Sequence, residues 1–239
     1  MEIRMPNQFN SNYRFNADEV GSVVSSGYKA FLRDAGYVDL DITPNLFVVS
    51  SMLRVDDRVA ECAAKQNIGL YHKSDNVISR INQYDGRMLV NGLGGVLLTN
   101  AFMRSLVIPS IKDASKKGEK FADSTLNEMV NDYAEFTEDS IKERRRLVIG
   151  NAERDIELKK GSGYFNRSDI DEYGFPTTFR GDGKFMYWNN NNCDIAVIRN
   201  RSSGLNLSLS GTPADTMDVL GVRFAKFFRD EKELEYLFK

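Results

Sequence analysis

The chain has 239 residues, of which 41% are apolar and 28% are charged, and its 34 acidic and 32 basic side chains leave a net charge of −2. This composition excludes an intrinsically disordered chain, and it lacks the basic excess that is typical of a dedicated nucleic-acid-binding protein. The length suffices for one large domain or two small ones. The only histidine, His72, argues against His-rich zinc sites and histidine-dependent catalytic triads, and two cysteines are too few for a disulfide framework.

Residues 1–15 are polar and are predicted to form an extended arm that packs on a neighbouring subunit, with Phe9 and Tyr13 as candidate contact residues. The arm contains no apolar segment of the kind found in secretory signal peptides. We therefore expect a cytoplasmic protein or, if the source is a virus, one that is located in the particle.

Residues 16–158 are predicted to be mainly helical. Asn16 is the expected cap of a first helix and Thr43 that of a second, with room for a break near Asp56. The longest helical pattern covers residues 123–158, where apolar residues at helical spacing face one way and charged residues face the other.

Between these long patterns the chain is predicted to change structure several times. A short helix is expected for residues 76–83 and a brief strand around Met88, followed by a buried helix in the apolar stretch 93–111. Because that stretch contains Arg104 and Pro109, it is a poor membrane span, and we expect no membrane partner.

From about residue 160 the apolar period changes from that of a helix to that of a strand. Four strands are predicted, at residues 176–180, 184–188, 193–199 and 205–210. They are expected to pair in chain order as an antiparallel meander, with Asn189–Asn192 as a four-residue hairpin loop. Thr212 and Pro213 mark the start of a C-terminal helix.

The predicted fold class is therefore α+β, with a mainly helical N-terminal two-thirds followed by a small antiparallel β-meander and a C-terminal helix. The meander and the helix occupy residues 159–239. This region is either a separate domain or continuous with residues 16–158, and the sequence leaves both alternatives open.

Gly92, Gly94 and Gly95 are candidate cofactor-binding residues, because they lie between a predicted strand and a predicted helix. This order can place a phosphate on a helix N-terminus. The known motifs are incomplete, since Leu97 occupies the third glycine position of the dinucleotide fingerprint and no Lys-Ser/Thr pair follows as in a P-loop. A tight turn between closely packed elements is the favoured explanation, and we expect no cofactor and no bound metal.

Two charged clusters are candidate sites. Arg144 and Arg145 belong to the densest basic run and are candidate contacts for phosphate, nucleic acid or an acidic partner, although a charged helix face is favoured. Asp169, Asp171 and Glu172 could bind a hard cation, but the EF-hand pattern is absent and a solvated loop is expected.

The strand at residues 184–188 is apolar on both faces, with Tyr187 on one and Trp188 on the other. If one face covers the helices, the other must meet the terminal helix or another subunit. Tyr187 and Trp188 are therefore candidate interaction residues.

These features favour a non-enzymatic structural or assembly protein that contacts copies of itself or other subunits, such as a viral or phage capsid, neck or tail component. An extended arm and an exposed sheet edge are the expected means of contact. The alternative is a nucleotide- or phosphate-binding enzyme that uses the loop Gly92–Gly95. A weaker alternative is a nucleic-acid-binding accessory protein.

Overall fold

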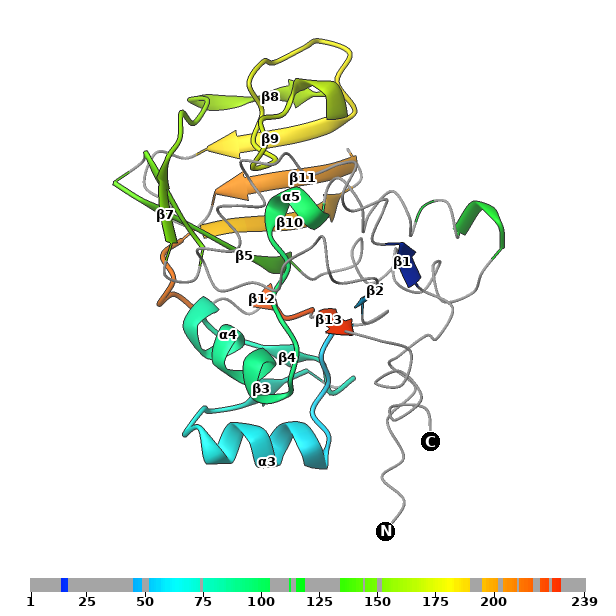
Figure 1. The fold of residues 1–239 in the computed structure, drawn as a ribbon, viewed down its shortest axis with the longest axis vertical. Helices are drawn as coiled ribbons and strands as arrows, with labels where there is room; N and C mark the ends of the chain where they lie inside the picture. The colour runs from blue at the N-terminus through cyan, green and yellow to red at the C-terminus, as the bar shows by residue number, and fades with distance from the viewer. Residues whose placement is uncertain are drawn as a thin grey trace.

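In the computed structural model, the described residues are 14–16, 45–48, 52–73, 75–103, 112, 115–118, 134–143, 145–149, 152–189, 195–201, 204–209, 211–216, 220–223 and 225–228. They form a β-rich fold in which an eight-stranded sheet is accompanied by two smaller sheets and short helices (Figure 1).

The eight-stranded sheet has the order β7-β6-β5-β10-β11-β9-β8, and β12 pairs with β5 outside this path. Its strands are β5 (Ala134–Lys142), β6 (Arg146–Ile149), β7 (Ala152–Asp155), β8 (Gly161–Phe165), β9 (Phe185–Asn189), β10 (Ile195–Arg201), β11 (Gly204–Leu209) and β12 (Leu220–Gly221). Neighbouring strands are antiparallel, except for the parallel pairs β9–β11 and β5–β12.

The smaller elements lie around this sheet (Figure 1). One sheet joins β1 (Arg14–Asn16), β2 (Asn45–Val48) and β13 (Ala225–Phe228), and another joins β3 (Tyr71–His72) and β4 (Ile78–Ser79). The helices are α3 (Asp57–Lys65), α4 (Gln83–Gly92), α5 (Asn100–Phe102) and the 3₁₀ turn η2 (Arg167–Asp169). Asp56 caps α3 by accepting from the Val59 amide, and Asn82 caps α4 by accepting from the Asp85 amide, each at 2.8 Å.

Different elements cover the two faces of the sheet. On the face that we call the α4 face, Ile195 and Val197 of β10 share a buried apolar core with residues of α3 and α4. The opposite face, the α5 face, carries Tyr187 and Leu207, which are fully buried. Because side chains alternate along a strand, the register assigns every residue of the sheet to one face or the other.

The predicted fold class is wrong, because the described part of the chain is mostly strand. The longest predicted helix, residues 123–158, contains the three antiparallel strands β5, β6 and β7 instead. Thr137, Glu138 and Asp139 are all buried, so β5 is covered on both faces. Its polar, helix-compatible residues concealed this from a reading of apolar periodicity.

Other predicted helices in the N-terminal two-thirds are corrected as well. The expected second helix is strand β2 in its first part, and helix α3 begins only at Asp57, close to the expected break. Residues 78–79 form strand β4 where a short helix was expected, and Met88 lies in α4 where a strand was expected. Arg14–Asn16, where the predicted arm meets the cap of the first predicted helix, is a strand, and the helix itself lies outside the described residues.

The predicted meander is right in one pair and wrong in another: β10 and β11 are antiparallel neighbours as expected, but β9 is misplaced. β9 pairs in parallel with β11 and not with β10, so Asn189–Asn192 does not close a hairpin. Asn189 of β9 and Ala196 of β10 pair with the same residue, Leu209, from its two sides. Alternation identifies strands correctly but does not specify their partners, which long-range packing selects.

The two ends of the predicted β-region differ from expectation too. Residues 176–180 are not a strand, whereas Gly161–Phe165 forms the edge strand β8. The described part of the predicted C-terminal helix contains β12 and β13, and residues 229–239 lie outside the described residues. Strands from both predicted regions, before and after residue 158, pair in one sheet.

Gly183 should be essential to the edge of the sheet. A Cβ at this position would stand 2.6 Å from the Tyr164 carbonyl carbon and would overlap the Phe165 backbone, whereas a Cβ at Gly181 would meet nothing within 4 Å. We expect Gly183→Ala to lower the free energy of unfolding by about 1–3 kcal/mol, and Gly181→Ala to change it by less than about 0.5 kcal/mol. Urea denaturation of both variants measures the difference, and equal effects would contradict the close approach.

Candidate functional site

The glycines of the candidate cofactor loop end a helix. Gly92 is the last residue of α4, Gly94 has a φ of 74°, and the Gly95 amide donates to the Val90 carbonyl at 2.9 Å. With the Gly94 amide bonded to the Asn91 carbonyl at 2.9 Å, this is a Schellman C-cap. The C-terminal end of a helix carries partial negative charge, so the geometry offers no support for a phosphate here, and ligand binding by this loop stays a prediction.

The candidate interaction residues are placed very differently from one another. Phe9, Tyr13 and Arg144 lie outside the described residues. Arg145 is exposed at the turn between β5 and β6. Tyr187 is fully buried on the α5 face, whereas Trp188 is 49% exposed on the α4 face, so only Trp188 of this pair is accessible to a partner.

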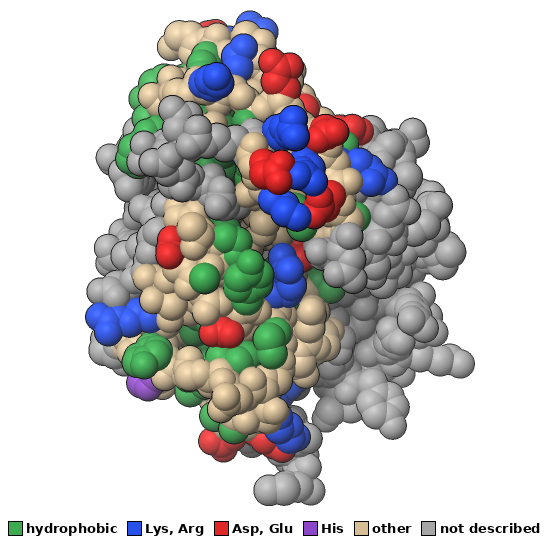
Figure 2. Space-filling view, turned by 90° about the vertical axis from the view of Figure 1, so that its left-hand side faces the viewer, with side chains coloured by type: hydrophobic (Ala, Val, Ile, Leu, Met, Phe, Trp, Pro, Cys, Tyr) green, Lys and Arg blue, Asp and Glu red, His purple; other side chains and the backbone are tan. Residues whose placement is uncertain are grey.

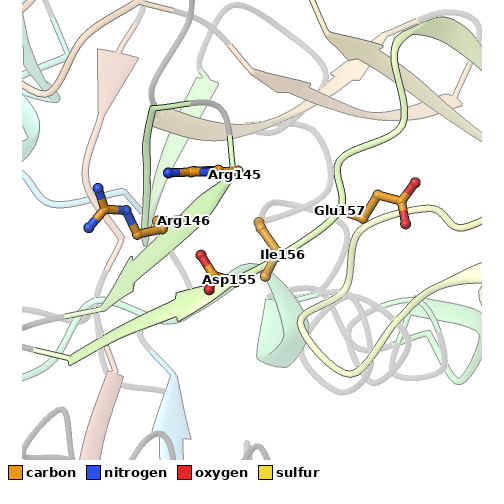
Figure 3. Close-up of a pocket in the computed structure, with 5 residues that line it drawn as sticks. All are labelled: Arg145, Arg146, Asp155, Ile156 and Glu157. Atoms are coloured by element: carbon orange, nitrogen blue, oxygen red, sulfur yellow. The ribbon is translucent and has the colours of Figure 1, made fainter.

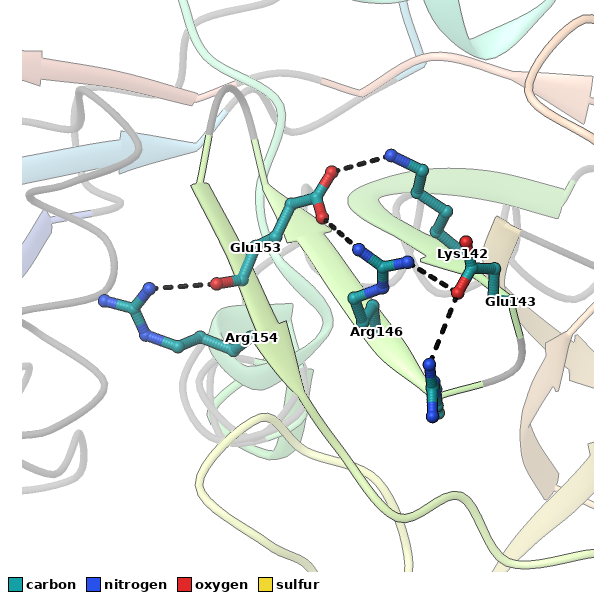
Figure 4. A network of polar contacts seen from close by, with 6 residues as sticks. Lys142, Glu143, Arg146, Glu153 and Arg154 are labelled. Carbon is teal, nitrogen blue, oxygen red and sulfur yellow. Dashed lines mark hydrogen bonds and ion pairs between the residues drawn. The ribbon is translucent and has the colours of Figure 1, made fainter.

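The described residues of the basic run, Lys142, Arg145 and Arg146, pair with acidic neighbours in a surface network on β5, β6 and β7 (Figure 4). Glu153 receives Lys142 Nζ at 2.9 Å and Arg146 Nη1 at 3.2 Å, and Glu143 pairs with Arg146 at 2.5 Å and more loosely with Arg145 at 3.7 Å. Hydrogen bonds from Lys142 and Arg146 lower the pKa values of Glu153 and Glu143 respectively. Figure 2 shows the result as interleaved basic and acidic side chains.

An open hollow of about 560 Å³ lies beside this network (Figure 3). It is lined by Arg145, Arg146, Asp155, Ile156 and Glu157. The two arginines are matched by two carboxylates, so the hollow has no net preference for an anion from these side chains. It resembles a groove within a charged surface more than a built ligand site.

A second polar cluster is buried at the middle of β5. Residues 137–139 of this strand have no paired residue on any described neighbouring strand. The Gln83 side chain of α4 donates to the carbonyls of Thr137 at 2.8 Å and Asp139 at 3.2 Å, and accepts from Ser140 Oγ at 2.7 Å. The Glu138 amide donates to the Leu98 carbonyl at 2.9 Å. Side-chain and loop groups thus replace the missing strand bonds.

An ion pair closes the same region on the α4 face. Arg87 Nε lies 2.8 Å from Glu138 Oε1, and Arg87 Nη2 donates to the Glu138 carbonyl at 3.3 Å. The Glu138 side chain is only 4% exposed, so Arg87 neutralises a charge that would otherwise be unpaired in the interior. The cluster fixes α4 on the sheet, and its residues are not among those that line the hollow described above.

The acidic segment 169–172 is a structural element rather than a solvated loop. Asp169 is buried and accepts from the Asn166 amide and from Arg180 Nε, at 2.9 and 2.8 Å. The Asn166 amide lowers the pKa of Asp169, burial opposes this, and Arg180 lowers it further. Asp171 Oδ1 accepts from the amides of Tyr173 and Phe175 at 3.0 and 2.8 Å and so holds the following turn.

Each of the two outermost strands of the eight-stranded sheet has a backbone carbonyl at its outer edge that already accepts a hydrogen bond. On β7, Arg154 Nη1 donates to the Glu153 carbonyl at 2.9 Å, and Glu153, Arg154 and Asp155 line the strand with charge. On β8, the Arg180 amide donates to the Tyr164 carbonyl at 2.7 Å. Charges and covering loops are features that discourage edge-to-edge strand pairing, so the expected sheet extension finds no support at either strand.

Two large aromatic side chains are exposed on the α4 face at β8 and β9. Tyr164 is 40% exposed and Trp188 is 49% exposed. Tyr164 pairs with Met186, and Trp188 pairs with Ser162, so the two aromatic residues are diagonal neighbours on adjacent antiparallel strands. Diagonal neighbours lie within reach of each other when the side chains are large. We call Tyr164, Met186 and Trp188 the aromatic patch.

No protein-family model, curated protein or solved structure matches this chain. Within the described ranges, no helix has the length and apolar character needed to cross a membrane. The same part of the chain brings together no group of three His, Cys, Asp or Glu side chains that could hold a metal ion.

Sequence reasoning identified Trp188 but missed Tyr164, because β8 was not predicted and its residues had no assigned face. It also missed Gln83, Glu138 and Asp139, since buried polar residues in a strand carry no apolar signal. The sequence did contain one signal for the antiparallel neighbours β6 and β7. Ile149 and Ala152 are paired residues of these strands, and the Gly-Asn dipeptide between them is typical of a two-residue hairpin.

Replacement of Gln83 should test the buried cluster. Gln83→Met keeps the volume but leaves the carbonyls of Thr137 and Asp139 without this donor, so we expect the free energy of unfolding to fall by about 2–4 kcal/mol. Asn91→Met, at an exposed position of the same helix, should change it by less than about 0.5 kcal/mol. Chemical denaturation compares the two, and a neutral Gln83→Met would show that the amide does not support β5.

Proposed function

We propose that this protein is a non-enzymatic structural or assembly component, which contacts further copies of itself or other subunits of a particle such as a viral or phage capsid, neck or tail. The observation that carries the proposal is the aromatic patch, in which the only tryptophan of the chain is half exposed beside a second exposed aromatic residue.

The chemistry of the patch suits a protein interface. Tryptophan and tyrosine are enriched among the residues that dominate binding energy, because each buries a large rigid surface and keeps a polar group for hydrogen bonding. Trp188 and Tyr164 stand on paired strands, so the sheet holds their backbones in place before binding. Little conformational entropy would therefore be lost when a partner covers them.

The sheet face is a better contact surface than the sheet edge. The edge groups of β7 and β8 are engaged by Arg154 and by the Arg180 amide, as described above. The charged network on β6 and β7 is internally paired, which favours a role at the polar rim of a contact rather than at its centre.

Solution mass measurements test the proposal in two steps. The unmodified protein should form a defined oligomer. Its mass, measured by analytical ultracentrifugation, should stay above that of the monomer over a wide range of protein concentrations. Trp188→Ser should weaken this association at least about tenfold, because loss of a central aromatic contact costs about 2 kcal/mol or more.

Tyr71→Ser is the matched control, since Tyr71 is 58% exposed on β3. It should leave the oligomer unchanged. A strictly monomeric protein with no co-purifying partner would refute the assembly function, whereas an oligomer that resists Trp188→Ser and dissociates with Tyr71→Ser would refute only the aromatic patch.

A further inference from the structure

Asp139 is a buried carboxylate with an incomplete set of partners. It lies in the middle of β5 on the α5 face, and its side chain is fully buried. Oδ2 accepts a hydrogen bond from the backbone amide of Asn100 at 2.5 Å, whereas Oδ1 has no hydrogen-bond partner among the described residues. Ionisation of such a group is costly, because the interior replaces only part of its hydration.

Asn100 links Asp139 to a distant loop. Asn100 begins α5, and its Nδ2 donates to the Tyr173 carbonyl at 3.2 Å. Gly174, with a φ of 83°, approaches so closely that an added Cβ would stand 2.9 Å from the Ala101 Cα. Asp139 therefore joins the sheet to α5, and Asn100 joins α5 to the loop at residues 171–175.

Asp171 holds the other end of this connection. Its carboxylate accepts from the amides of Tyr173 and Phe175, as given above, and so sets the turn that presents the Tyr173 carbonyl to Asn100. The turn also directs Phe175 into the interior, where its side chain is fully buried. Release of the turn would expose this ring.

We propose that Asp139, Asn100 and the loop at residues 171–175 form a pH-sensitive clamp, which is closed in mildly acidic solution and loosens as the pH rises towards neutrality. The clamp holds α5 and the loop on the sheet. Its opening would uncover apolar surface on the α5 face, which is separate from the aromatic patch on the α4 face.

The charges around the clamp favour protonated carboxyl groups. Burial raises the pKa of Asp139 to about 7, the backbone amide of Asn100 and the side chain of Thr137 oppose the shift, and Glu138 on the same strand adds to it. Burial also raises the pKa of Asp171 to about 6, with Glu172 adding to the rise and the amides of Phe175 and Tyr173 opposing it.

Among the described residues, further titratable groups near the clamp come from the same loop and from β7. Burial and Glu172 raise the pKa of Tyr173 to about 12, and Arg154 opposes this rise. Arg87 is paired with Glu138 on the opposite face of β5. The residues of α5, Asn100 to Phe102, contain no titratable group.

The sign of the pH dependence follows from proton linkage. A carboxyl group with a raised pKa in the closed state binds a proton that it releases when the clamp opens and water reaches it. Between the open-state pKa of about 4 and the closed-state value near 7, the opening constant should rise by up to about tenfold per pH unit from Asp139, and then level off. Asp171 contributes in the same direction up to about pH 6.

Hydrogen exchange at about pH 5 and about pH 8 brackets both pKa values and tests the clamp. After correction for intrinsic exchange rates, amides of residues 99–103 and 171–175 should lose protection at least about tenfold more than those of α3 between the two conditions. Equal changes in all three segments would overturn the proposal.

Two substitutions identify the groups responsible. Asp139→Asn keeps the shape but stays neutral at both pH values, so it should remove most of the pH dependence in both segments. Asp182→Asn, at an exposed position of a neighbouring loop, should leave that dependence intact. Full pH dependence in Asp139→Asn would exclude Asp139 as the sensor.

Asp171→Asn provides a second reading in case Asp139→Asn does not fold. It should reduce the pH dependence of hydrogen exchange at residues 171–175. Part of the pH dependence at residues 99–103 should remain, because Asp139 still titrates there. Unchanged pH dependence in this variant would overturn the proposed part of Asp171. None of these outcomes depends on the oligomeric state, so the clamp and the assembly function can fail independently.

Discussion

The burial of β5 is the constraint on which the rest of the structure depends. This strand pairs with β10, β6 and β12, and it is covered on one face by α4 and on the other by the segment that contains α5. Its middle residues have no partner in the sheet register, so their backbone groups rely on Gln83, Arg87 and Leu98. A buried strand requires that every such group be bonded, and this requirement fixes where α4 and the segment before α5 lie.

The polar residues of β5 therefore act as connectors. Glu138 points to the α4 face and binds Arg87, while Asp139 points to the α5 face and binds the Asn100 amide. Apolar residues at these positions would pack, but they would not specify which helix and which loop must dock. Buried polar groups of this kind restrict the arrangement because alternatives leave them unsatisfied.

The aromatic patch and the clamp lie on opposite faces of the sheet. The aromatic patch lies on β8 and β9, beyond the area that α3 and α4 cover. The clamp lies on the opposite face, at Asp139, whose carboxylate accepts from the backbone amide of Asn100. Assembly through one face and pH response at the other would be compatible, because the sheet separates them.

The sequence by itself determined the local features whose causes are local. Alternation located β9, β10 and β11 to within a few residues, and the break near Asp56 marked the start of α3. Only the tertiary structure decided that β5, β6 and β7 are strands, that β9 joins β11 rather than β10, that Trp188 is exposed while Tyr187 is buried, and that Gly92, Gly94 and Gly95 end a helix. The reason is physical: strand partners and buried polar bonds form between residues far apart in the chain, so no local pattern records them.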